Sequence, residues 1–151
     1  MEDISGRKVI GTVEKIKLIG KDGKEIEVEA KIDTGAGFTS MDTELARELG
    51  FEEAVDFFEK LSLPKDFERK DAKSILEDMR KKYLPQNSDM IDIDIIYSSH
   101  GVSIRPKVKI VFVLDGVEVS AGANIVERKE LKYGVIIGRK NLSKFLIDVN
   151  K

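Results

Sequence analysis

Hydrophobic and polar residues alternate along the first third of the chain, as in strands that bury one face. Residues 9–13 and 14–19 form one such stretch, and residues 25–32 alternate strictly. Residues 20–23, which lie between them, contain an Asp-Gly pair typical of tight hairpin turns. We therefore predict a hairpin whose second strand ends directly on Asp33.

The middle of the chain changes to a helical period. Residues 44–49 follow Asp42 and Thr43, either of which can cap a helix, and a glycine closes the segment. Residues 51–61 and 67–84 carry apolar side chains at helical spacing, and each segment stops before a proline.

The predicted helical insertion lies around residues 43–84, and about residues 50–86 interrupt the β pattern. We interpret this interruption as an insertion into a mainly β domain of residues 1–151. It is either a lid or a structural packing layer. In the last third, the strand pattern returns, with turns at residues 98–101 and 115–116 and a short helix at 139–142. The predicted strands there are residues 90–97, 102–106, 108–114, 117–125, 133–138 and 145–149.

Composition narrows the function classes. The formal net charge is -2, whereas a general nucleic-acid binder needs surplus Lys and Arg. No apolar run approaches the roughly 20 residues of a membrane helix, and the N-terminus lacks the apolar core of a signal peptide. We expect a cytoplasmic protein without nucleic-acid or membrane partners. Because there is no cysteine, thiol nucleophiles are excluded, and the single histidine cannot build a His-rich zinc site.

The strongest candidate for chemistry is the run Asp33, Thr34, Gly35 and Ala36 at the end of the predicted strand. A carboxylate at a strand end can be presented to a cleft, and a glycine allows a tight turn with close backbone approach. The alanine leaves room for a substrate, and the Thr34 hydroxyl, with Ser40 nearby, can brace the site. The alternative for Asp33 is a purely structural role, as a turn or helix-capping aspartate.

Three segments carry a resemblance to a known family. Residues 30–36 resemble the active-site strand of retropepsin-like aspartic peptidases, and residues 134–142, with their Gly-Arg pair, resemble the second signature of that group. Residues 98–106 lie where the flap hairpin belongs. The pattern is similar, more narrowly, to the retropepsin-like family labelled ATP-dependent zinc proteases. The resemblance implies a closed β-barrel with one lobe per chain, interrupted here by the helical insertion.

The family label implies ATP and zinc, but this sequence offers no phosphate-binding loop and too few zinc ligands. We therefore expect no cofactor and no metal. The retropepsin chemistry needs two carboxylates, and one Asp-Thr-Gly per chain supplies one. The expected enzyme is a homodimer in which two Asp33 side chains share one proton, because two adjacent carboxylates cannot both ionise cheaply. The anionic member would activate water, and the neutral member would hydrogen-bond the scissile carbonyl.

The resemblance also assigns supporting roles. The expected scaffold of the site is Thr34, Gly35, Ala36, Ser40, Gly138 and Arg139, and the expected flap and substrate-binding residues are Ser98, Ser99, His100, Gly101 and Arg105.

For some of these residues, structural or surface roles remain as alternatives. Arg139 is expected to form a structural ion pair, although Gly37 stands where retropepsins commonly carry an acid. His100 is either exposed or in contact with substrate, with direct catalysis as the lesser alternative. Arg105 either binds an acidic group of the substrate or lies on the surface. Asp92 and Asp94 are expected to form a solvated face, with cation binding as an alternative.

The predicted function is therefore amide-bond hydrolysis by a homodimeric aspartic peptidase acting on peptides or acidic polypeptides. The alternative is a non-catalytic binding or assembly module that keeps the barrel.

Overall fold

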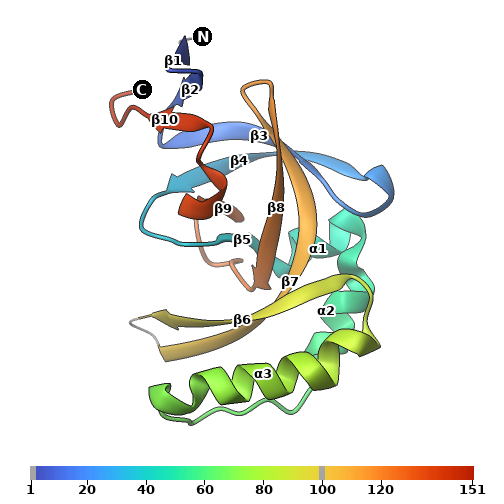
Figure 1. Ribbon diagram of the computed structural model, residues 1–151. Helices are drawn as coiled ribbons and strands as arrows, with labels where there is room; N and C mark the ends of the chain where they lie inside the picture. Colours follow the sequence, from blue (N-terminus) through green and yellow to red (C-terminus); the bar gives the residue numbers. More distant parts are fainter. Residues whose placement is uncertain (1–2, 99–100) are drawn as a thin grey trace.

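The computed structural model describes residues 3–98 and 101–151. It is mainly β, and six of its strands close into a barrel (Figure 1). The barrel strands, in spatial order, are β3 (Val13–Ile19), β4 (Glu25–Asp33), β9 (Val135–Gly138), β5 (Thr39–Asp42), β8 (Val117–Val126) and β7 (Gly101–Leu114). The pairing of β3 with β7 closes the ring. The predicted fold class, a closed β-barrel with a helical insertion, is confirmed.

The barrel forms because alternate residues of each strand point into one core. In β4, Ala30 and Ile32 are buried while Lys31 is exposed, as the alternation predicts. At the closing seam Leu18 pairs with Phe112, and neither side chain is accessible to solvent. The hairpin of β3 and β4 is antiparallel, as expected, and delivers Asp33 at its end.

Strand β6 (Met90–Ser98) lies outside the ring and pairs only with β7, so the two strands project from the barrel as a long hairpin (Figure 1). The sequence predicted residues 102–106 and 108–114 as two strands, where the structure has the single strand β7. Pro106, which has no amide to donate, does not interrupt pairing with β8, because that pairing begins only at Lys107.

The helical insertion packs against this hairpin. Its helical segments are α1 (Thr43–Ala46), η2 (Arg47–Phe51), α2 (Glu52–Glu59), η3 (Arg69–Asp71), α3 (Ala72–Tyr83) and η4 (Leu84–Gln86). Asp42 caps α1 by accepting a hydrogen bond from the Glu44 amide. Gly50, with φ of 94°, does not end the helical region but turns the chain from α1 into α2. Helix α3 begins later than the predicted residue 67 and lies along β6 (Figure 1).

Both ends of the chain meet in a separate small sheet of β1 (Asp3–Ile4), β2 (Arg7–Ile10) and β10 (Phe145–Ile147) (Figure 1). The alternating stretch predicted at residues 9–19 is therefore divided between this sheet and the barrel. Strands β1 and β5 were not predicted. In the described part of the chain, no helix is long and apolar enough to cross a membrane.

Candidate active site

Asp33 is the last residue of β4 and is partly exposed. Strands β4 and β9 run parallel, with Asp33 beside Gly138. The chain then loops around the end of β9 and returns as β5 on its other side. Within this loop the Asp33 Oδ1 atom accepts a hydrogen bond of 3.0 Å from the Gly35 amide. The carboxylate is thus held by its own loop, with its orientation set before any ligand arrives.

The short helical turn η5 (Arg139–Asn141) fastens the loop to β9. The Arg139 amide donates to the Ala36 carbonyl at 2.8 Å, and the Lys140 amide donates to the Gly37 carbonyl at 3.2 Å. The Arg139 Nη1 atom donates to the Thr34 carbonyl at 2.8 Å. Arg139 therefore supports the loop through a backbone oxygen. The expected ion pair is absent, since no described carboxylate lies within salt-bridge distance of its guanidinium.

Thr39 supplies a contact that the sequence did not indicate. Its side-chain oxygen accepts a hydrogen bond from the Gly138 amide at 3.2 Å and donates to Asn141 Oδ1 at 2.7 Å. The Thr39 side chain is fully buried, whereas Thr34 is exposed. The hydroxyl that braces the loop within one chain is therefore that of Thr39, and Thr34 is left accessible.

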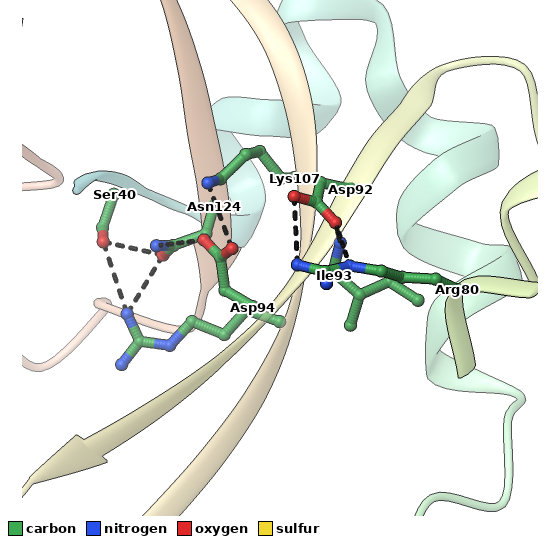
Figure 2. Close-up of polar contacts among 8 residues, drawn as sticks. Ser40, Arg80, Asp92, Ile93, Asp94, Lys107 and Asn124 are labelled. Carbon is green, nitrogen blue, oxygen red and sulfur yellow. Dashed lines mark hydrogen bonds and ion pairs between the residues drawn. The ribbon is translucent and has the colours of Figure 1, made fainter. Parts of the chain in front are cut away.

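Ser40 belongs to a second group of polar residues behind the loop, which Figure 2 shows. The Ser40 hydroxyl donates to Asn124 Oδ1 at 2.7 Å, and both residues are buried. The Arg105 Nη1 atom donates to Asn124 Oδ1 at 3.0 Å and to Ser40 Oγ at 3.3 Å. Ser40 thus connects to Arg105 of the hairpin, and Arg105 points toward the barrel wall.

Asp94 completes this group, which corrects the expectation that Asp92 and Asp94 form a solvated face. Asp94 is 5% exposed, and its carboxylate contacts Lys107 Nζ at 3.0 Å. Asp92 instead binds the Arg80 guanidinium of α3, at 2.7 and 3.3 Å (Figure 2). Since each carboxylate already has a cationic partner, the alternative of a shared cation site is not supported either.

Another arginine, Arg128, interacts with the charge of the catalytic candidate, Asp33. Its amide donates to Asp42 Oδ1 at 2.6 Å, and its Nε donates to the Tyr133 carbonyl at 3.1 Å. Burial lowers the pKa of the Arg128 guanidinium, while the negative charges of Asp33 and Asp42 oppose this shift. Burial, and then the positive charge of Arg128, also lower the pKa of Arg105, with Asp94 acting in the opposite direction.

These shifts mean that the half-buried charges of Arg105 and Arg128 repel each other and that Asp33 lies within the field of Arg128. The sequence assigned no role to Asn124 or to Arg128. The one local signal was a polar Asn inside the small and apolar run of β8.

Two of the predicted flap residues, Ser98 and Gly101, pair with each other at the end of the β6–β7 hairpin, and Arg105 lies further along β7, opposite Asp94. Ser99 and His100 fall outside the described residues. The hairpin end and the loop between β4 and β5 project on the same side of the molecule (Figure 1).

Solved structures with distant similarity to the chain include the following two proteins. One is the protein Lpg0085 of Legionella pneumophila, described as of unknown function (DUF785), with a TM-score of 0.49 and 14% identity. That comparison covers 95% of this chain and 94% of the other. The other is the protease of Simian foamy virus, with a TM-score of 0.39 and 15% identity, covering 85% of this chain and 91% of that one.

No protein-family model matches the sequence, and no curated protein matches it. Neither structural similarity assigns an activity, and the family of ATP-dependent zinc proteases is not identified by any match. The candidate site consists of the oriented Asp33 carboxylate in a loop that is hydrogen-bonded to η5. Arg139 binds this loop, Arg128 interacts with the charge of Asp33, and Arg105 binds Ser40 behind the loop.

Proposed function

We propose that the protein is an aspartic-type amide hydrolase that works as a homodimer. The observation that carries this proposal is the placement of Asp33. Its carboxylate is partly exposed at the end of a barrel strand, in a loop fastened by hydrogen bonds from Gly35, Arg139 and Lys140. Rigid support of a single accessible carboxylate is what general acid–base catalysis requires.

The dimer follows from the chemistry. Water attack on an amide by this route needs one carboxylate to take a proton and a second to hydrogen-bond the carbonyl. One chain supplies one Asp-Thr-Gly run, so a second copy would supply the other carboxylate. The exposed Thr34 beside Asp33 is available for contact across the dimer axis.

An acidic polypeptide is the substrate class that the surrounding charges favour. Arg105 and Arg128 are half-buried near the loop, and neither guanidinium forms an ion pair with a described carboxylate. Next to β4 lies a hollow of about 430 Å³ whose lining includes Lys31, Arg128 and Lys132 and no acidic side chain. In a chain of net charge -2, such a cationic region can attract a negatively charged substrate.

The direct test is Asp33→Asn, which keeps the size of the side chain and removes its capacity to act as a base. We expect the hydrolysis of poly-L-glutamate, or of an uncharged unfolded polypeptide, to fall at least about 1000-fold, with unchanged thermal unfolding. The matched control is Asp22→Asn, at the opposite end of the same hairpin, in a left-handed turn position that asparagine tolerates. Full activity in the Asp33→Asn variant would refute the carboxylate mechanism.

Sedimentation equilibrium tests the dimer separately. A strictly monomeric protein that still hydrolyses polypeptides would exclude the shared pair of carboxylates. A protein that binds polypeptides in an Asp33-independent manner and hydrolyses none would instead be the non-catalytic binding module.

A further inference from the structure

A continuous set of polar contacts runs through the barrel wall from Asp94 of β6 through Asn124 to Ser40 (Figure 2). Arg105 joins this set through Asn124 and Ser40. We call it the Asp94 network. It comprises Lys107, Asp94, Asn124, Ser40 and Arg105. Each strand that contributes is a neighbour of the next, because β8 lies between β5 and β7, and β7 lies between β8 and β6.

Asn124 is the centre of this network and is fully buried. Its Nδ2 atom donates to Asp94 Oδ2 at 3.3 Å, and its Oδ1 atom accepts from Ser40 at 2.7 Å and from Arg105 at 3.0 Å. A carboxylate can only accept and a guanidinium can only donate, so the amide has a single orientation that satisfies both neighbours. Asp94 therefore sets the direction in which the Asn124 carbonyl points.

The negative charge of Asp94 is itself balanced within the wall. Lys107 Nζ lies 3.0 Å from Asp94 Oδ1, and the two side chains are only 11% and 6% exposed. The same ammonium lies 3.9 Å from the centre of the Phe38 ring, in the loop that carries Asp33. A buried carboxylate with both an ion-pair partner and an amide donor is held in one position.

Arg105 differs from Lys107 because its direct hydrogen bonds reach only neutral oxygens. Nε donates to Ser103 Oγ at 2.9 Å, and Nη1 donates to Ser40 and Asn124. Its Nη2 atom donates to no described residue, and no described carboxylate forms an ion pair with it. The guanidinium is thus positioned on one edge and has a remaining edge for an anionic ligand.

We propose that Asp94 is a positioning residue for Arg105, which it holds through the Asn124 amide so that the guanidinium can bind an anionic group of the substrate. This inference rests on the proposed function for the identity of the ligand. The contacts that define the positioning are independent of it. Lys107 supports the same arrangement because its ammonium pairs with the Asp94 carboxylate at 3.0 Å.

The test is Asp94→Asn, and Asp92→Asn is its matched control. Both changes remove a carboxylate from β6 that is paired to a cation, but only Asp94 contacts Asn124. The first readout is the side-chain Nη1–H resonance of Arg105, assigned by its loss in Arg105→Lys. In Asp94→Asn we expect this proton to exchange with water about ten-fold faster, because Nη1 donates to Asn124 Oδ1 and the Asn124 amide loses the carboxylate that orients it. In Asp92→Asn it is expected to stay within about two-fold of the parent.

The second readout is binding of fluorescein-labelled poly-L-glutamate, measured by anisotropy in the Asp33→Asn background so that hydrolysis plays no part. Asp94→Asn should weaken this binding about ten-fold, and the KM for poly-L-glutamate in the active protein should rise while kcat changes little. If Asp94→Asn leaves a chain that does not fold, the pair Asp94→Asn with Lys107→Met replaces it, because this pair leaves no unpaired buried ammonium.

The outcomes separate the two proposals. If the Arg105 proton exchanges equally in Asp94→Asn and Asp92→Asn, the positioning role is wrong, whatever the activity. If that proton responds as expected but the parent neither binds nor hydrolyses poly-L-glutamate, the positioning stands and the substrate class is wrong.

Discussion

Next to the candidate site, the position of Gly138 has no room for a side chain. A Cβ at this position would overlap the carbonyl group of Phe38 and would stand 2.8 Å from the Phe38 Cα. The crowding comes from the main chain of the site loop, which cannot move aside as a flexible side chain can. Because Gly138 lies beside Asp33 in the sheet, any shift of Phe38 would reach the carboxylate.

We therefore expect Gly138→Ala to lower the free energy of unfolding by about 2–3 kcal/mol, the upper part of the usual range for overpacking, and to reduce hydrolysis with it. The matched control is Gly134→Ala in the segment before β9. Its new Cβ would stand 3.9 Å from the Asp42 Cβ, an ordinary contact. That control should change stability by less than about 0.5 kcal/mol in urea unfolding. Equal stability of the two variants would show that the loop is not packed against Gly138.

The β6–β7 hairpin has a polar face and an apolar face, and residues of the helical insertion lie next to the apolar face. Asp94 pairs with Arg105, and Ile95 pairs with Ile104, so polar and apolar pairs alternate along the hairpin. The polar face turns toward Asn124 and Ser40. The apolar face borders a hollow of about 300 Å³ that is lined by residues of the insertion and by the hairpin residues Val102 and Ile104.

The insertion also contacts the hairpin near its end. The guanidinium carbon of Arg69, at the start of η3, lies 4.1 Å from the centre of the Tyr97 ring. At the base of the hairpin, Arg80 of α3 binds Asp92. The insertion thus supports the hairpin along its outer face, as a packing layer would, and restricts how far the hairpin can move by itself.

Arg69→Ala should consequently loosen the hairpin end without unfolding the barrel. A cation–π contact at an exposed site contributes about 0.5–1 kcal/mol, so we expect amide exchange in β6 and early β7 to accelerate about two- to five-fold. Hydrogen exchange with mass spectrometry measures this, and thermal unfolding should be nearly unchanged. Lys70→Ala is the control, because Lys70 is exposed and, among the described residues, forms an ion pair with Glu68 alone. The same acceleration in both variants would count against support by the insertion.

At the scale of the whole molecule, stability depends on closing the barrel between β3 and β7. Phe112 is the largest of the fully buried side chains and lies directly on this seam, paired with Leu18. The two strands are far apart in the sequence, so their pairing forms only when the whole ring forms. The barrel is therefore expected to unfold as one cooperative unit.

Phe112→Ala should lower the free energy of unfolding by about 3–5 kcal/mol, because it removes a large buried side chain and leaves a cavity. Chemical denaturation monitored by far-UV circular dichroism measures the loss, and a single transition should persist. Val149→Ala, at a position that is 74% exposed, should stay within about 0.5 kcal/mol of the parent. A small effect at Phe112 would mean that the seam contributes little to the stability of the barrel.

Much of this architecture could be predicted from local pattern. Strict alternation located β4 and its end at Asp33, and the helical period located α3. The Asp-Gly pairs at residues 22–23 and 115–116 marked two of the turns. Strand β5 escaped prediction because its Thr39 and Ser40 are polar, and only their burial between β8 and β9 makes them part of the core.

The sequence by itself determined that a carboxylate followed by small and hydroxyl residues would stand at a strand end, because turn and strand propensities are local. Only the tertiary structure decided what surrounds that carboxylate. Asp94 looked solvent-facing by its alternation, yet it is buried, since Lys107 and Asn124 of the neighbouring strands satisfy it. Ser40 and Asn124 are 84 residues apart in the chain, and Arg139 and Thr34 are 105 apart. Such contacts depend on the register of a closed barrel, which no local pattern records.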